Sequence, residues 1–265
     1  MCLIVLAWQV PPDYPLVVAA NRDEYFSRPT LPAAFWPEAP DVLGGRDLQA
    51  GGSWLGISRD GRFAALTNYR EGGAPRAGAR SRGALVGDYL CGPDDGATHL
   101  ADAAAHAGDY GAFNLLVGDR ERLGYLANRG PLGAPPAPPR WLPAGIHGLS
   151  NHLLDTPWPK LAAARTDFAA ALRTLPDERA FFRLLADREI VADHRLPATG
   201  VPLAWERVLS AIFVAAPEHD YGTRASTLLA VHREGSVLFV ERRFDAAGRE
   251  AGEVRHAFRL AAAPR

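Results

Sequence analysis

Apolar residues run almost without interruption over positions 2–10, and a second apolar run, 16–20, follows a turn containing Pro11, Pro12 and Asp13. Continuous apolar runs between turn signals are typical of strands that are buried on both faces. The β-branched residues in both runs, and the prolines between them, favour strand over helix. The pattern therefore predicts a buried N-terminal hairpin.

The same pattern predicts further hairpins and a set of helices. Polar turns at 59–61, 118–122 and 233–235 separate apolar runs as in β-hairpins. The predicted strands are 54–58, 62–69, 112–117, 123–127, 145–151, 224–232, 236–242 and 253–259. Apolar residues at helical spacing predict helices over 82–91, 97–107, 158–174, 177–187 and 202–215. The segments 25–52, 70–80 and 131–143, which are rich in proline or glycine, are expected to be loops.

The order of these elements bounds the fold. Strands near both ends of the chain with helices between them predict an α+β architecture, in which helices pack outside antiparallel sheets. No repeat or linker divides the 265 residues, so we expect one domain over 1–265.

Charge and apolar run lengths exclude several classes of function. The net charge is −1 and the isoelectric point is near 6.7, so no overall field favours nucleic acid or an anionic membrane. No stretch approaches the ~18 apolar residues of a membrane span, and the N-terminal run lacks the basic start of a signal peptide. Two cysteines indicate no disulfide framework. We therefore expect a cytoplasmic protein without a membrane span.

Cys2 is the first candidate for chemistry, because it becomes the chain terminus if Met1 is removed. A thiol nucleophile and a free α-amine would then lie on one residue. The α-amine has an unperturbed pKa near ~7.7–8.0, so enough of it is neutral at pH 7 to accept the thiol proton. The structural alternative is a small buried residue, since free cysteine is among the most buried residue types.

Four polar residues, Asn21, Arg22, Asp23 and Glu24, end the second apolar run and return the chain close to Cys2. One interpretation is a solvated strand end. The functional interpretation is that Arg22 lowers the pKa of the neighbouring thiol, while Asp23 or Glu24 orients the α-amine. The spacing does not choose between the two acids.

Ten short segments occur in order along essentially the whole chain. They are MC (1–2), NRDEY (21–25), GGRD (44–47), GGSWLG (51–56), TNYR (67–70), SRG (81–83), FNLLVGD (113–119), GLSNH (148–152), LPATG (196–200) and YGTRASTLL (221–229). Together they resemble the NRDE-motif family, also called the transport and Golgi organisation protein 2 family. That family is similar to N-terminal nucleophile hydrolases of the cholylglycine hydrolase and penicillin V acylase group. The resemblance implies a four-layer αββα sandwich, in which two antiparallel sheets lie face to face and helices lie outside.

The resemblance also implies catalytic roles. Cys2 matches the N-terminal nucleophile. Arg22 matches an arginine of that group, and Asp23 or Glu24 matches an acidic residue. The group usually separates these two by two residues, whereas in this chain they are adjacent or nearly so. The implied reaction is hydrolysis of a linear amide or related acyl bond in a small molecule, through a thioester on Cys2.

Later segments supply the remaining implied residues. Asn151 in GLSNH is the best match to an oxyanion-stabilising asparagine, and Asn68 is the other candidate. Arg224 in YGTRAST matches a late arginine. A second hypothesis follows from the family's links to haem trafficking and to lipid or acyl-coenzyme A metabolism. It is a non-catalytic carrier or chaperone that binds haem or an acyl ligand in the same pocket.

The remaining candidates line the expected pocket. Asn21, Glu24, Asn68, Tyr69 and Arg70 are the predicted substrate-binding residues. Four arginines in and beside the predicted loop 70–80 have donors suited to carboxylate or phosphate, although a solvated arginine-rich loop is the favoured interpretation; they are Arg70, Arg76, Arg80 and Arg82. No HExxH or CxxC motif occurs, so neither a metal nor a cofactor is expected. The oligomeric state is left open.

Overall fold

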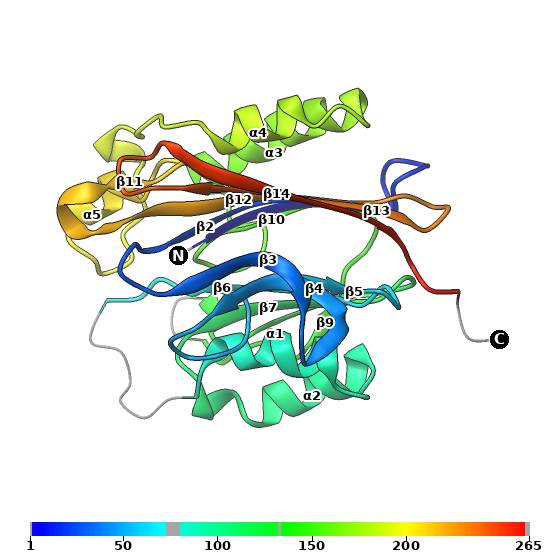
Figure 1. The fold of residues 1–265 in the computed structure, drawn as a ribbon. Helices are drawn as coiled ribbons and strands as arrows, with labels where there is room; N and C mark the ends of the chain where they lie inside the picture. Colours follow the sequence, from blue (N-terminus) through cyan, green and yellow to red (C-terminus); the bar gives the residue numbers. More distant parts are fainter. Residues whose placement is uncertain (1, 73–79, 132–133, 263–265) are drawn as a thin grey trace.

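The computed structural model describes residues 2–72, 80–131 and 134–262, and in this part of the chain the strands form two antiparallel sheets (Figure 1). The order in the first sheet is β10 (Gly145–Leu149), β1 (Cys2–Trp8), β2 (Leu16–Tyr25), β12 (Tyr221–Val231), β13 (Ser236–Phe244) and β14 (Glu250–Arg259), with β11 (Ala215–Ala216) paired to β12. The N-terminal hairpin predicted from the apolar runs is therefore at the centre of this sheet.

The second sheet follows chain order from strand to strand. Its members are β3 (Thr30–Trp36), β4 (Ala39–Asp47), β5 (Leu55–Ser58), β6 (Phe63–Asn68), β7 (Phe113–Gly118), β8 (Leu123–Ala127) and β9 (Arg140–Trp141). Neighbours in this meander are joined by antiparallel pairing throughout.

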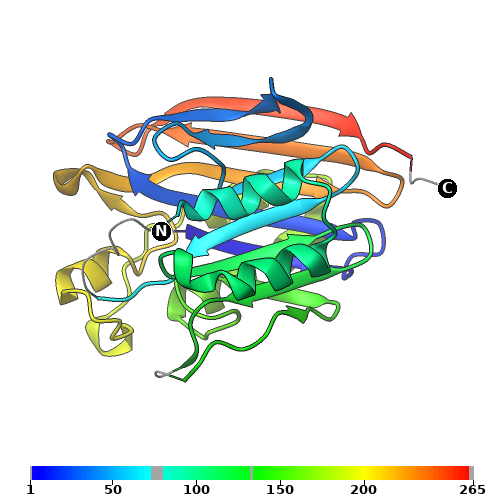
Figure 2. The same cartoon turned by 90° about the horizontal axis from the view of Figure 1, so that it is seen from below.

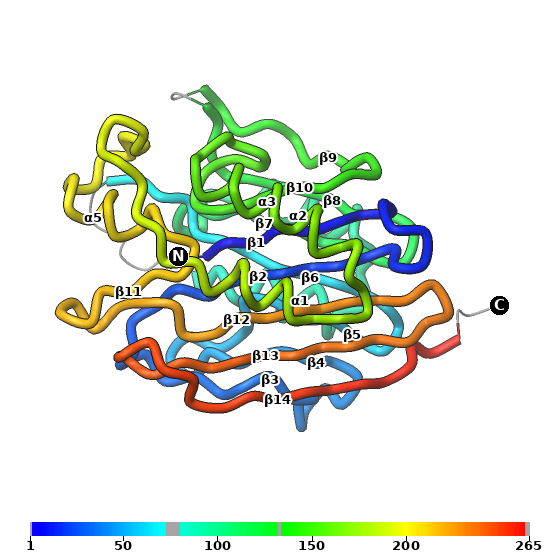
Figure 3. The backbone as a smooth tube through the Cα atoms, turned by 90° about the horizontal axis from the view of Figure 1, so that it is seen from above, coloured from blue at the N-terminus to red at the C-terminus, as the bar shows by residue number. Residues whose placement is uncertain are grey.

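Helices cover the outer faces of both sheets. The helices α3 (Pro159–Ala171) and α4 (Arg179–Leu185) pack on the first sheet, as Figure 3 shows from above. The helices α1 (Arg82–Cys91) and α2 (Gly96–Ala105) lie side by side on the second sheet (Figure 2). A short α5 (Leu203–Val208) lies near β11, and 3-10 turns occupy Ala107–Asp109, Leu172–Thr174, Asp193–Arg195 and Pro217–His219. No helix in the described ranges is long and apolar enough to cross a membrane.

This arrangement confirms the predicted αββα sandwich, and it explains the unbroken apolar run of β1. Side chains alternate between the two faces of a strand. Ile4 and Leu6 pack against the second sheet, whereas Leu3 and Val5 pack beneath α3 and α4. Both faces of β1 are therefore buried, and the sequence has no polar alternation.

The predicted loop over 25–52 is wrong, because β3 and β4 occupy most of it. Its prolines are placed where a strand tolerates a missing N–H donor. Pro32 lies at a register shift in β3, which is an edge strand, and Pro40 lies near the start of β4. Proline content alone therefore gave the wrong assignment for this segment.

Other boundaries differ as well; for example, β9 lies in the predicted loop 131–143, and two further differences bear on the site. β2 continues through Tyr25, so the four polar residues 21–24 lie inside a strand between β1 and β12. The helix predicted over 202–215 ends at Val208. Beyond it, tertiary bonds replace helical ones: the Phe213 N–H donates to the Asp187 carbonyl and the Val214 N–H to the Thr223 hydroxyl.

Candidate active site

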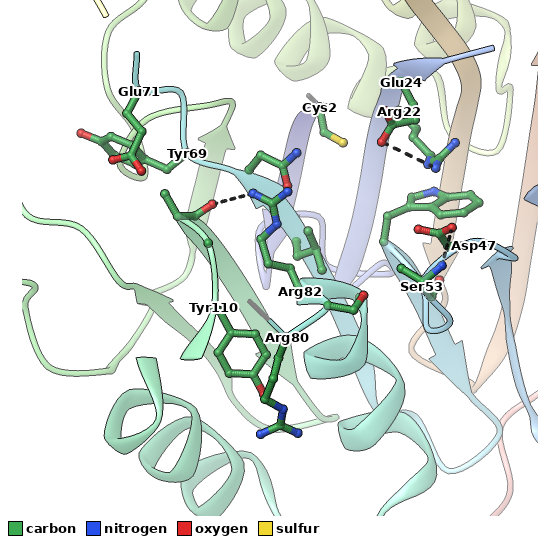
Figure 4. A pocket seen from close by; sticks show the side chains of 18 of the residues that line it. Cys2, Arg22, Glu24, Asp47, Ser53, Tyr69, Glu71, Arg80, Arg82 and Tyr110 are labelled. Atoms are coloured by element: carbon green, nitrogen blue, oxygen red, sulfur yellow. Dashed lines mark hydrogen bonds and ion pairs between the residues drawn. The ribbon is translucent and has the colours of Figure 1, made fainter. Parts of the chain in front are cut away.

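Cys2 begins β1 and lines a pocket of about 530 Å³ (Figure 4). The pocket is walled by β2, by the end of β6 and by the first residues of α1. Cys2 itself is 9% exposed, so the pocket is the route by which a small molecule would reach its sulfur.

The strand β2 divides its four polar residues between two faces. Arg22 is the cross-strand partner of Cys2 and, like Cys2, faces the second sheet. Asn21 faces the helix layer, where its amide donates to the carbonyls of Leu185 and Ile212 at 2.8 and 2.9 Å. The structure therefore does not bring the Asn21 side chain to this pocket, and its substrate-binding role stays a prediction.

Arg22 and Glu24 form part of the pocket wall. The Arg22 guanidinium lies 4.2 Å from the centre of the Trp54 ring and 4.0 Å from the Glu24 carboxylate. Glu24 is also 3.9 Å from Arg28. Arg22 is thereby fixed in orientation while its charge stays close to Cys2.

Asp23 is buried on the opposite face of β2. The Thr223 hydroxyl donates to its carboxylate at 2.7 Å, and the Tyr221 hydroxyl donates to its backbone carbonyl at 3.1 Å. Burial raises the pKa of Asp23, whereas Lys160 and the Thr223 bond lower it. Of the two candidate acids, Asp23 is the enclosed one, while Glu24 is engaged by arginines at the rim.

Burial also raises the pKa of the Cys2 thiol. Arg22 and a backbone hydrogen bond from Asp23 act in the opposite direction, because both favour a thiolate. The net shift is upward, so the thiol needs a base to become a nucleophile.

The two candidate asparagines lie together. Asn68, at the end of β6, lines the pocket, and its carbonyl accepts a hydrogen bond at 2.9 Å from the Asn151 amide. Asn151 is fully buried behind Asn68, and the adjacent Ser150 hydroxyl reaches the Cys2 carbonyl at 3.3 Å. The structure thus brings both asparagines close to Cys2, and Asn68 is the one that lines the pocket.

Tyr69 and Arg70, both predicted to bind substrate, point to different places in the structure. Tyr69 lines the pocket and lies against the His152 ring at 4.9 Å. Arg70 is buried and pairs with Glu206 at 2.7 Å, so it does not line this pocket, and its substrate-binding role stays a prediction. Arg76 falls outside the described residues.

Arg224 lies at an irregularity in β12, opposite the polar segment of β2. The register shifts between Thr223 and Ala225, which leaves Arg224 as the extra residue of a β-bulge. Its guanidinium donates to the backbone carbonyls of Tyr25 and Arg28. Arg224 therefore supports the pocket rim near Arg28 and is not one of the pocket's lining residues.

Sequence reasoning missed Lys160, the only lysine of the chain. It is buried in α3, and its ammonium donates to the Leu209 carbonyl at 2.9 Å. Burial lowers its pKa to about 8, and Asp23 and Cys2 lie within its electrostatic range. The available signal was compositional, since this is the single lysine among 29 Lys and Arg residues. In the described ranges, no group of three His, Cys, Asp or Glu side chains could hold a metal ion.

The fold is that of the N-terminal nucleophile hydrolases. The chain is similar to the C2A mutant of conjugated bile acid hydrolase from Clostridium perfringens, with a TM-score of 0.50 and 8% sequence identity. The match covers 97% of this chain and 92% of that one. At this identity the similarity establishes the fold alone.

The chain belongs to the Transport and Golgi organisation 2 family, whose family model matches residues 1–246. It is 38% identical to the Transport and Golgi organization protein 2 homolog of Bos taurus, over 91% of this chain and 92% of the relative. It is 34% identical to the Homo sapiens homolog, with the same coverage.

Proposed function

We propose that this protein is an N-terminal-cysteine hydrolase that cleaves an amide or related acyl bond of a small molecule. The observation that carries the proposal is the position of Cys2. Cys2 lines the pocket on the same face of the sheet as Arg22. Asp23, in β2, lies beside the start of β1. The fold shared with N-terminal nucleophile hydrolases supports this interpretation.

The reaction begins with removal of Met1, which frees the α-amine of Cys2. The amine takes the thiol proton, and the thiolate attacks the substrate carbonyl to form a tetrahedral intermediate. The amide of Asn68 or Asn151 stabilises the oxyanion. The C–N bond then breaks, the α-ammonium returns its proton to the leaving amine, and the acyl group remains as a thioester on Cys2.

Water completes the cycle. The α-amine accepts a proton from water, the hydroxide adds to the thioester, and the carboxylic acid leaves as the thiol is restored. In this proposal Asp23 accepts a hydrogen bond from the amine and holds it in position. Burial raises the pKa of that carboxyl group, and Lys160 and Thr223 oppose the shift.

The test is turnover of a panel of N-acyl amides and thioesters by the parent protein and by Cys2→Ala. We expect the variant to lose at least about 10³ of kcat/KM, as expected for loss of a covalent nucleophile. Cys91→Ala is the matched control, because Cys91 is an exposed cysteine outside the pocket, and full activity is expected. Unchanged turnover in Cys2→Ala would refute the proposal.

A second candidate function is a carrier that binds haem or an acyl or acyl-coenzyme A ligand in the same pocket. The arginine-lined pocket of about 530 Å³ favours it, because guanidinium groups bind carboxylate and phosphate groups such as those of haem and acyl-coenzyme A. Saturable micromolar binding of haem or an acyl-coenzyme A, combined with no turnover of any panel member, would favour the carrier over the hydrolase.

A further inference from the structure

Among the residues that the structure describes, five arginines and four acidic residues line the pocket. The arginines are Arg22, Arg28, Arg80, Arg82 and Arg129, and the acidic residues are Asp23, Glu24, Asp47 and Glu71. The charges come from separate segments of the chain, so the pocket is polar on several sides. Which arginines are available to a ligand depends on their existing partners.

Two of the five arginines are paired to lining carboxylates in close geometry. Arg28 contacts Asp47 at 2.6 Å. Arg129 donates to both carboxylate oxygens of Glu71 at 2.8 Å, the bidentate arrangement in which guanidinium binds carboxylate most strongly. A ligand anion would have to displace these internal acids. Neither side chain is therefore a ready binding group.

Arg82 differs from these two. It is the first residue of α1, and one Nη donates to the Ala112 carbonyl at 3.0 Å. Within the described part of the chain its guanidinium makes no ion pair. Glu24 and Glu71 lie within electrostatic range of Arg82, but other arginines pair with them. A guanidinium has five N–H donors, so most of the donors of Arg82 remain for a ligand.

The orientation of Arg82 sets it apart from Arg80. Figure 4 shows the Arg82 guanidinium extending toward Cys2, whereas Arg80 turns the other way beside Tyr110. The Arg80 guanidinium lies 5.1 Å from the centre of the Tyr110 ring. Arg82 is partly buried, and burial lowers its pKa. An anion there would gain more from the charge than at an exposed arginine.

We propose that Arg82 binds an anionic group, a carboxylate or a phosphate, on the molecule whose carbonyl Cys2 attacks. The inference rests on the proposed function, because that function places the reacting carbonyl at Cys2. Planar guanidinium donors match the oxygens of both anions. The start of α1 adds to the attraction: Ser81 and Gly83 also line the pocket, and Ser81 makes no side-chain capping bond.

The substrate class is therefore an acyl compound that carries an anion, and matched probes can test it. N-butyrylglycine is paired with neutral N-butyrylglycinamide for the carboxylate. N-butyryl-O-phosphoethanolamine is paired with neutral N-butyrylethanolamine for the phosphate. Binding is measured by isothermal titration calorimetry on full-length Cys2→Ala protein, so the result does not depend on turnover.

We expect the anionic member of at least one pair to bind about tenfold more tightly than its neutral partner, as charge-assisted hydrogen bonds typically give. The pair that shows the preference identifies carboxylate or phosphate. Adding Arg82→Gln should reduce the preference to less than about threefold, and Arg82→Lys, which keeps the charge but loses the planar fork, should weaken it in part. Adding Arg80→Gln, which removes the same charge two residues away, should leave it intact.

Equal affinity within both pairs would overturn the proposal, and so would an equal loss of preference in the Arg80 and Arg82 variants. The latter result would mean that the general field of the pocket, not Arg82, selects the anion. Failure of the hydrolase proposal is seen separately, as unchanged turnover in Cys2→Ala. The Arg82 assignment is judged by binding alone.

Discussion

Cys2 and Arg22 are direct cross-strand partners in β1 and β2, so the thiol and the guanidinium leave the sheet on the same face. Arg22 is held over the Trp54 ring, and its charge opposes the effect of burial on the thiol pKa. Arg22 in β2 therefore lowers the pKa of the thiol of Cys2, the residue that begins β1.

Replacing Arg22 with Gln should raise the pKa of the Cys2 thiol, because the neutral side chain no longer favours the thiolate. The rate of iodoacetamide alkylation at Cys2, followed against pH by peptide mass spectrometry, gives this pKa. Cys91 in the same samples serves as the internal control and should not change. A Cys2 profile that stays the same or moves to lower pH would contradict the assigned role of Arg22.

Asp23 and Glu24 should differ in their effect on turnover. Asp23 is enclosed beside the start of β1, whereas Glu24 is already engaged by two arginines. We expect Asp23→Asn to lower kcat/KM by about 10² or more, as for loss of a group that orients the base. Glu24→Gln should cost less than about tenfold. The reverse order, measured on the same substrate, would assign the acidic role to Glu24.

The buried Arg70–Glu206 pair should act on stability. Glu206 also accepts bonds from the Thr199 N–H and hydroxyl at 2.9 and 2.6 Å, so without Arg70 it would remain buried and lose its ion-pair partner. Arg70→Met should therefore cost about 3–5 kcal/mol in the free energy of unfolding measured with urea. Adding Glu206→Gln to that variant should recover part of the loss. Strictly additive costs in the double variant would show that the two groups are not coupled.

The burial of the Glu241 carboxyl group predicts that the stability of the protein depends on pH. Glu241 is buried in β13 and accepts a hydrogen bond from the Ala33 N–H at 2.9 Å, and burial raises its pKa from 4.5 to about 7. The folded state holds this proton more tightly than the unfolded state does. Its stabilising contribution is thus complete below pH 4.5 and is lost as the pH rises through 7.

Glu241→Gln removes that titration. Relative to the parent, the free energy of unfolding of the variant should improve by roughly 1–3 kcal/mol between pH 5 and pH 8. Glu250, which is exposed at the start of β14, provides the control Glu250→Gln, for which no such change is expected. If the free energy of unfolding changes with pH in the same way in the parent and in Glu241→Gln, the buried carboxyl group is not the source of the pH dependence.

The sequence predicted the layers of the fold because they depend on local pattern, and it singled out Cys2, which lines the pocket. The unbroken apolar run of β1 and the family segments were sufficient for that. Arg70 could not be placed in this way. Asn68 and Tyr69, which precede it, line the pocket, whereas the Arg70 guanidinium binds Glu206, which is 136 positions away in the chain. Partners so far apart in sequence have no local signal.

Alternation along β2 is a second limit. Asn21, Arg22, Asp23 and Glu24 formed one polar cluster in the sequence, yet a strand sends successive side chains to opposite faces. Only when β2 is known to continue to Tyr25 does the cluster divide, with Arg22 and Glu24 facing the pocket and Asn21 bonded to the helix layer. The strand's length, not its composition, set these roles.

The central claim is that Cys2 acts as an N-terminal nucleophile, and mass spectrometry of the intact protein tests it most directly. The purified chain is measured before and after brief exposure to a thioester substrate and acid quenching. The account predicts a mass lower by one methionine residue, and then a further mass equal to the acyl group, located on Cys2 and absent from Cys2→Ala. A chain that retains Met1 and gains no acyl group at Cys2 would contradict it.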